Sequence, residues 1–498
     1  MLRFKLLTAT ALALTLAACG GSSASNEAKV PANPSGKKTG TGIQVSKKAA
    51  AKFETALNQF VDFDKKQNWT PDTCKQVAEM FKAAGMEQFE ATNRPFPEAI
   101  YNAGLAHQRC GDDEKAQERF QAALEADSGF HRAKAQLILY DFQRTKDLDS
   151  AISSLDTVIR DAKYQNVEGL VALAALQMER GNGSEDLDTA KLNLQRALAI
   201  DDSFMPAFNQ LAIYYLELAR SKAAGGEAKS RRRGLVVSGA KGTDINAQQL
   251  DLAALVASQA MQKNPYYAPI HNTAGLIQVE LRNYNSAVQS FAKARQLDPS
   301  FFEAHMNYAA VNLSFRGFGE AEKAYKEALK LKPETFEAHL GLALAIRGQM
   351  EMGNREKLLP LAEKHIKKAR ELEPDRPETY YNEAILVQEF KAKGVEEDES
   401  IKQLLAAANI YDDFVKRASG EPGFAQAVKR ATERAQDARD TAEFIRQGKE
   451  LRAQEEADAK QRKADEARLK KEEAQKKKEE EARLKEEEQR KAKDAAKK

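Results

Sequence analysis

Three histidines recur at a fixed interval in the second half of the chain, and their side chains could bind a metal ion. His271, His305 and His339 are separated by 34 residues each. Imidazole nitrogens are common zinc ligands, but they must all lie about 2 Å from the same ion. Because one histidine per repeat places successive copies a whole structural unit apart, we expect a packing role on a helix and no shared metal.

A glycine-containing stretch, Gly234-Leu-Val-Val-Ser-Gly-Ala-Lys241, comes close to the spacing of a phosphate-binding loop. In that loop the lysine directly follows the second glycine and is itself followed by Ser or Thr at the start of a helix. Here Ala240 intervenes and Gly242 follows the lysine. The stretch therefore predicts a surface loop, and no cofactor or small-molecule substrate is expected from it. Other catalytic motifs of defined spacing do not occur in the sequence.

Two cysteines could form a disulfide if the chain is exported to an oxidising compartment. Cys74 and Cys110 lie 18 residues on either side of Thr92-Asn93. If the segments after Pro71 and Pro97 form an antiparallel helical hairpin that turns there, the two thiols are neighbours. Two buried free cysteines remain the alternative, because spacing alone does not give the geometry.

The residues that must position these side chains follow a 34-residue period from Ala268 to Thr335. Each period repeats a small residue, a second small residue, an aromatic residue, an alanine and a proline, at Gly275 and Ala309, Ala287 and Ala321, Phe291 and Tyr325, Ala294 and Ala328, Pro299 and Pro333. This spacing resembles the tetratricopeptide repeat (TPR), in which two helices per unit stack on the next unit. The resemblance implies an all-α solenoid.

We count eight repeat units, the fourth of which carries a long insertion. The insertion contains the basic cluster Arg231, Arg232 and Arg233, and we expect it to contact a partner or to act only as a spacer. The predicted organisation is a signal peptide at 1–19, a flexible linker at 20–45, a helical pair at 46–93, a repeat array at 94–418 with an insert at 221–249, a capping helix at 419–447 and a charged helix at 448–498.

The N-terminus has the features of a secretory signal. Arg3 and Lys5 precede a short apolar run, which ends in Leu16-Ala-Ala-Cys19-Gly20. This ending resembles the bacterial lipobox. The resemblance implies lipid attachment at Cys19 by diacylglycerol and an acyl chain such as palmitate. Gly20, rather than an Asp, follows Cys19, and by resemblance to other lipoproteins this favours the outer membrane, with the protein on the periplasmic side.

The C-terminal segment is highly charged. From Lys449 onward 33 of 50 residues are charged, 18 basic and 15 acidic. Acidic residues that precede basic residues by four positions support a solvated helix. A coiled coil needs apolar residues in a seven-residue repeat, which the spacing of Leu451, Leu469 and Leu484 does not sustain. Disorder is the remaining alternative. Before this tail we expect a capping helix whose last apolar anchors are Phe444 and Ile445.

The formal net charge of +3 predicts no affinity for nucleic acid. Lipobox, repeats and charged tail together resemble the TPR lipoproteins of Gram-negative envelope machines. More narrowly, the Cys-containing first hairpin and the long insert in the fourth repeat resemble a TPR lipoprotein of myxobacterial adventurous gliding motility. The resemblance implies a non-enzymatic, membrane-anchored scaffold for envelope proteins in motility, secretion or outer-membrane assembly. The alternative is a cell-wall-associated module that docks a peptidoglycan enzyme or has weak activity of its own.

By position, the resemblance also implies which residues line a partner groove on the first helix of each unit. A mixed apolar groove suits an extended or helical protein segment. The predicted groove residues are Tyr101, Arg109, Asn209, Asn272, Glu280, Met306, Leu340 and Arg347.

Overall fold

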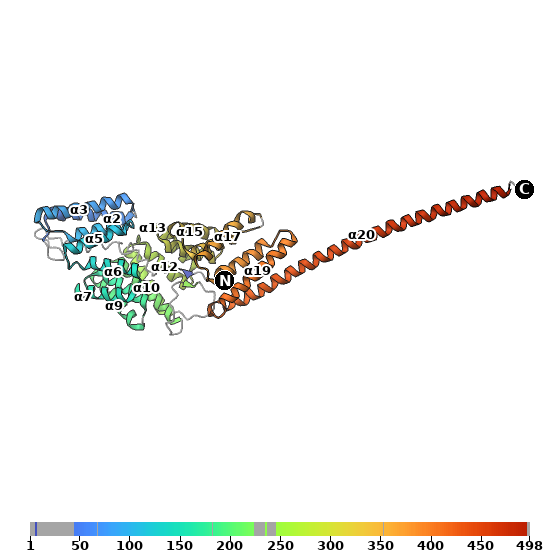
Figure 1. Ribbon diagram of the computed structural model, residues 1–498. Coiled ribbons are helices and arrows are strands. Elements are labelled where there is room, and N and C mark those ends of the chain that lie inside the picture. Colours follow the sequence, from blue (N-terminus) through green and yellow to red (C-terminus); the bar gives the residue numbers. More distant parts are fainter. Residues whose placement is uncertain are drawn as a thin grey trace. The chain divides into compact units, whose positions relative to one another are not determined.

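The computed structural model describes residues 5–6, 44–66, 68–181, 183–223, 235–236, 246–351 and 353–495. The chain divides into two compact units, Leu2–Gln349 and Met350–Lys498. Both consist of helices packed on their neighbours in sequence (Figure 1).

The first unit is a series of helical hairpins. The predicted all-α fold of repeated hairpins is therefore confirmed. An entry hairpin, α2 (Lys47–Lys66) and α3 (Pro71–Thr92), precedes the repeats. The repeats pair α4 (Pro97–Arg109) with α5 (Asp113–Ala126), α6 (His131–Thr145) with α7 (Leu148–Asp161), α8 (Val167–Arg180) with α9 (Gly183–Ile200), α10 (Met205–Ala223) with α11 (Ala247–Lys263), α12 (Ala268–Glu280) with α13 (Tyr284–Leu297), and α14 (Phe302–Ser314) with α15 (Phe318–Leu331), and are followed by α16 (Phe336–Gly348).

Polar caps define where several of these helices begin. Thr70 forms a reciprocal capping box with Thr73 at the start of α3, and Pro71 occupies the first turn. Asp112 and Asp147 accept a hydrogen bond from the backbone N–H three residues later, which satisfies one of the free donors at the start of α5 and α7. In these three helices the local sequence therefore fixes the starting residue.

Interlocking of glycine and aromatic side chains holds neighbouring helices at close range. A Cβ atom on Gly275 of α12 would lie 2.5 Å from Phe291 of α13, and one on Gly341 of α16 would lie 2.3 Å from Tyr325 of α15. Phe291 and Tyr325 are fully buried. Gly275 and Phe291 are repeated positions of the sequence and form the two sides of one packing contact. Gly341 lies outside the repeated small positions, but meets the repeated aromatic residue Tyr325.

Two short strands also occur in the first unit. β1 (Lys5–Leu6) pairs antiparallel with β2 (Leu235–Val236), with Lys5 opposite Val236. β1 lies beside α14.

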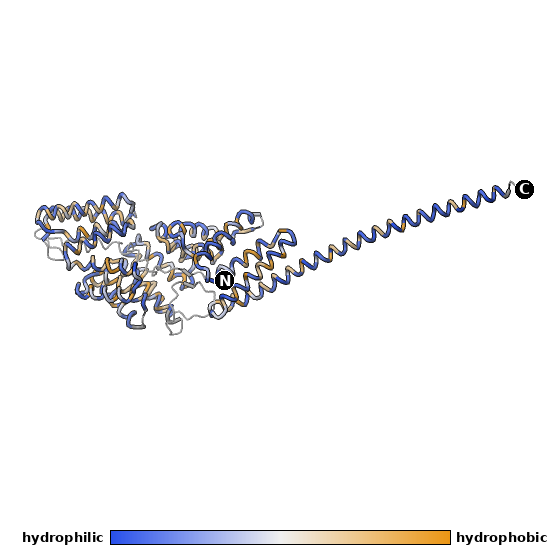
Figure 2. The backbone as a smooth tube through the Cα atoms, in the orientation of Figure 1, coloured by the Kyte–Doolittle hydropathy of each residue, from blue (hydrophilic) through white to orange (hydrophobic). Residues whose placement is uncertain are grey.

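The second unit contains α17 (Arg355–Leu372), α18 (Pro377–Leu386), a π-helical turn η2 (Val387–Lys391), α19 (Glu397–Ala418), a short 3-10 turn η3 (Pro422–Phe424) and α20 (Ala425–Ala495). Alanines at helical spacing, Ala431, Ala435, Ala438 and Ala442, are buried where α20 packs along α19. The expected capping helix and charged tail are one continuous helix, whose distal part is mostly hydrophilic (Figure 2).

One predicted anchor of the capping helix is wrong. Phe444 is 77% exposed and does not join the core. Because the buried alanine stripe continues from Ala442 toward Ile445, a residue one position earlier turns about 100° away from α19. Ile445 is partly buried, as its place on that stripe requires.

Candidate interaction surfaces

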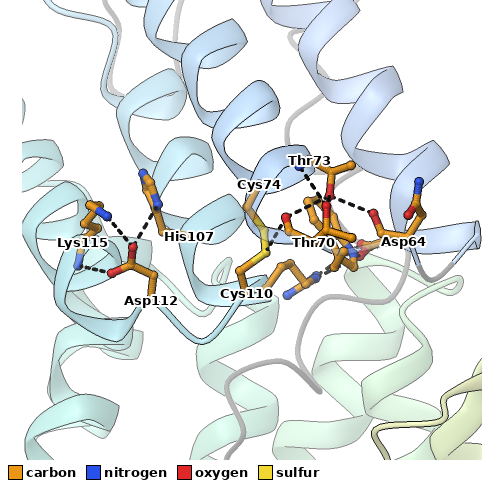
Figure 3. The surroundings of a disulfide bond; sticks show 11 residues. Asp64, Thr70, Thr73, Cys74, His107, Cys110, Asp112 and Lys115 are labelled. Atoms are coloured by element: carbon orange, nitrogen blue, oxygen red, sulfur yellow. Dashed lines mark hydrogen bonds and ion pairs between the residues drawn. A yellow bond between two sulfur atoms is a disulfide. The ribbon is translucent and has the colours of Figure 1, made fainter.

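The entry hairpin is fastened to the first repeat by a disulfide. Cys74 in the first turn of α3 and Cys110 at the end of α4 are bonded, with their Cα atoms 6.4 Å apart (Figure 3). The sequence predicted this pair, because the two cysteines lie at equal distances from the turn at Thr92-Asn93. The bond closes a loop of 36 residues and so restricts the unfolded chain.

Arg109, a predicted groove residue, lies instead at the contact between the entry hairpin and the first repeat. Its Nε and Nη2 donate to Asp64 of α2 at 2.9 and 3.3 Å. Only 5% of the Arg109 side chain and 13% of the Asp64 side chain are exposed. The guanidinium also lies 5.2 Å over the Phe60 ring. Arg109 is therefore committed to the contact between entry hairpin and repeat, and a partner does not reach it.

Tyr101 is likewise not a groove residue, because a polar network buries it completely. Its hydroxyl donates to Glu168 Oε2 at 2.6 Å, and Arg132 Nη2 donates to Glu168 Oε1 at 3.0 Å. The Arg132 guanidinium stacks on the Tyr101 ring at 4.5 Å. Burial raises the pKa of Tyr101 well above its usual value, so the hydroxyl remains a donor. The network joins α4, α6 and α8, and sequence spacing gave no sign of it.

The asparagines predicted to line the groove form hydrogen bonds between first helices. Asn209 Oδ1 of α10 accepts from Thr273 of α12 at 2.7 Å, and Asn272 Oδ1 of α12 accepts from Asn307 of α14 at 2.9 Å. All four side chains are buried. First helices of successive repeats contact one another directly. This contact buries the asparagines that would face a groove if the first helices lay further apart.

The remaining predicted groove residues divide into buried and partly exposed ones. Met306 and Leu340 are buried. Glu280 accepts from Arg220 Nε at 2.7 Å and is partly exposed, as is Arg347. Only 14% of the Glu280 side chain is exposed, so Glu280, like Arg109, is held in an ion pair within the repeats. Arg347 is the remaining predicted position with a partly exposed residue.

The three periodic histidines share one structural contact. Each Nε2 lies within hydrogen-bond distance of the carbonyl oxygen of the proline six residues earlier: His271 of Pro265 at 2.8 Å, His305 of Pro299 and His339 of Pro333 both at 2.9 Å. Tyr380 of the second unit makes the equivalent bond to Pro374 at 3.2 Å. Since a carbonyl only accepts, Nε2 carries the proton. The histidines tie each first helix to the turn before it.

Burial lowers the pKa of His271 and His305, which favours their neutral form. Among the residues that the structure describes, no group of three or more histidines, cysteines or carboxylates is arranged to hold a metal.

Two predicted sites lie outside the described residues. These are the lipid attachment site Cys19 and the basic cluster Arg231–Arg233 of the insert. None of the described helices is both long enough and apolar enough to cross a membrane.

The distal part of α20 offers a different kind of surface. From Ala453 to Lys493 every residue is exposed except Asp465, which is partly exposed. An ion pair such as Glu487 with Lys491, at 3.3 Å, lies along the helix rather than between helices. The side chains of this segment are therefore exposed along about 60 Å of helix.

Comparison with known proteins identifies the repeat type. A family model described as a tetratricopeptide repeat matches residues 97–130, which include α4 and α5. No curated protein matches the chain in sequence.

Several solved structures are similar over part of the chain. A thermophilic TPR protein of Thermus thermophilus is 23% identical, covering 44% of this chain and 99% of its own, with a TM-score of 0.35. A tetratricopeptide repeat protein of Parabacteroides merdae is 18% identical, covering 61% and 99%, with a TM-score of 0.34. Pseudomonas aeruginosa PilF is 18% identical, covering 49% and 92%, with a TM-score of 0.35. The chain thus carries a tetratricopeptide repeat at residues 97–130, within a larger series of helical hairpins.

Proposed function

We propose that the protein is a non-enzymatic, lipid-anchored scaffold that holds partner proteins of a bacterial envelope complex together. The lipobox-like ending at Cys19 supports attachment to the outer membrane, with the repeats on the periplasmic side. The complex is one of motility, secretion or outer-membrane assembly, and the resemblance to gliding lipoproteins is the ground for including motility.

The observation that carries the proposal is the continuous helix α20. Tetratricopeptide arrays bind proteins through surfaces of their helices. In this chain α20 begins against α19 and continues for 71 residues in all, with its distal part exposed on every side. Such a helix extends about 1.5 Å per residue, so its C-terminal end lies far from the part that packs on α19.

The anchor is tested by metabolic labelling with a fatty acid and by membrane fractionation. The wild-type chain is expected to take up label and to sediment with outer membranes. Cys19→Ser is expected to take up none and to appear in the soluble periplasmic fraction. Equal labelling of both chains, or wild-type protein in the soluble fraction, rejects the anchor.

Scaffolding is tested by affinity purification from detergent-solubilised membranes. We expect the full chain to recover several envelope proteins together, and a chain truncated after Arg452 to lose some of them while its repeats remain folded. Truncation after Arg452 keeps the buried alanines of α20 and the pairs that Lys449 and Arg452 form with Asp398 and Glu397 of α19. Recovery of one enzyme alone, or of no protein, contradicts the scaffold.

A further inference from the structure

One face of α20 has exposed apolar side chains and a glycine at which the backbone of another helix could approach. The stripe Ala431 to Ala442 contacts α19, so residues about half a turn away point outward. Phe444 and Leu451, seven residues apart, are 77% and 58% exposed there. Two large apolar side chains on the same side of a helix are a typical anchor for another helix.

Gly448 lies between these two residues inside the helix. Glycine in a helix interior is less favourable than alanine by about 1 kcal/mol. A Cβ atom at this position would meet only Arg452 Nη1 at 3.6 Å, an ordinary contact distance. The packing of the chain itself does not require glycine here. A missing side chain between Phe444 and Leu451 allows the backbone of a second helix to approach closely.

Charges on this part of α20 are sorted by side. Basic residues face α19, where Arg439 pairs with Asp412, Lys449 with Asp398 at 2.5 Å and Arg452 with Glu397. Arg446 pairs along the helix with Glu443. Between Asp437 and Asp458 the outward half carries exposed acids and no base: Asp437, Asp440, Glu443, Glu450, Glu455 and Asp458. Of these acids, Glu443 is the one that Arg446 pairs with. The apolar pair therefore has an acidic surround.

We propose that this outer face of α20, formed by Phe444, Gly448 and Leu451 with their acidic surround, binds a basic amphipathic helix of a partner protein. Lysines and arginines beside the apolar stripe of that helix would meet the acids of α20, which speeds association and sets orientation. A second copy of this chain is a poor occupant because it brings an identical acidic surround. The inference rests on the proposed scaffold function, since it names the class of partner that one surface of the scaffold accepts.

The test uses the full chain carrying Cys19→Ser, so that binding is independent of the anchor. The probe is a fluorescent amphipathic peptide of leucine, alanine and lysine, compared with a peptide in which glutamate replaces every lysine. We expect anisotropy to show saturable binding of the lysine peptide that weakens with salt, and no binding of the glutamate peptide. Phe444→Ser with Leu451→Ser is expected to weaken binding at least tenfold, and Gly448→Ala to weaken it while leaving helicity unchanged or raised.

Leu469→Ser with Leu484→Ser is the matched control. These leucines are also more than half exposed on α20, but lie on the distal segment, so their loss should leave the affinity unchanged. Equal loss in both double variants overturns the site, because it shows general attraction to apolar groups of the tail. Binding of both peptides, or sedimentation showing a dimer that the Phe444 and Leu451 variant dissociates, also overturns it. If the peptide fails to bind while membrane purification still recovers partners, the scaffold function stands and only this surface is rejected.

Discussion

Arg295 Nε donates a hydrogen bond to His305 Nδ1 at 3.0 Å. The other ring nitrogen of His305 bonds to the carbonyl of Pro299, so Nε2 carries the proton and Nδ1 accepts. The Arg295 guanidinium also stacks 4.3 Å from the Tyr308 ring. Protonation of His305 would place a second donor against Arg295, and the neutral imidazole is therefore part of the packing between α13 and α14.

A pH dependence of stability follows from this arrangement. Burial lowers the pKa of His271 and His305 in the folded state, so the unfolded chain binds protons more tightly. The stability that the neutral rings contribute is fully present above the unfolded pKa of about 6.5. It is lost as the pH falls from there toward the lower folded pKa. We expect urea unfolding to show a lower free energy of unfolding at pH 5.5 than at pH 7.5.

The control protein carries His271→Gln with His305→Gln. The glutamine side chain still offers an N–H donor but does not titrate between pH 5.5 and 7.5. Its loss of stability between the two pH values should be smaller than that of the wild type, while His107, whose pKa burial also lowers, is common to both. Identical pH dependence in the two proteins contradicts the assignment.

A second prediction concerns the glycine and aromatic contacts. Gly275→Ala places a methyl group 2.5 Å from the buried Phe291 ring, and overpacking of this kind costs about 1 to 3 kcal/mol. Gly85→Ala is the control within a helix, because nothing lies within 4 Å of its added Cβ. It should stabilise by about 0.5 to 1 kcal/mol through helix propensity. Thermal unfolding of both variants measures the difference, and a neutral Gly275→Ala would show that the helices separate freely.

The disulfide gives a third prediction. Breaking a bond that closes 36 residues lowers stability by about 3 to 4 kcal/mol in the chain-entropy model. We expect reductant to lower the midpoint of urea unfolding of the entry hairpin in the wild type but not in Cys74→Ser with Cys110→Ser. A wild-type midpoint that does not respond to reductant would mean that the bond adds nothing to the Asp64 and Arg109 contact beside it.

A fourth prediction concerns the distal helix. A peptide of residues 453–495 has no apolar core to pack, and its helicity depends on acid and base pairs worth about 0.2 to 0.5 kcal/mol each. Circular dichroism should show helix at low salt and a partial loss at 1 M salt, because salt screens exposed pairs. Helicity that rises with peptide concentration would instead mean self-association.

The sequence predicted what depends on period and on local residue type. The 34-residue repeat placed Gly275 and Phe291 correctly on facing helices, because their contact lies within one hairpin. It misplaced Tyr101 and Asn272, whose burial depends on how closely successive first helices approach. Arg132 and Glu168 come from different repeats and meet only through the stacking angle, which no spacing encodes. The exposure of Phe444 follows from the alanine stripe, but only once α19 is known to cover that stripe.

The most direct measurement for the scaffold is lysine crosslinking in intact cells followed by mass spectrometry. The lysines of α20 beyond Arg452 are exposed wherever the structure describes their side chains, and we expect crosslinks from them to more than one envelope protein. These crosslinks should be lost in Cys19→Ser while crosslinks within the repeats persist. Crosslinks confined to the chain itself, or unchanged in Cys19→Ser, would contradict a membrane-anchored scaffold.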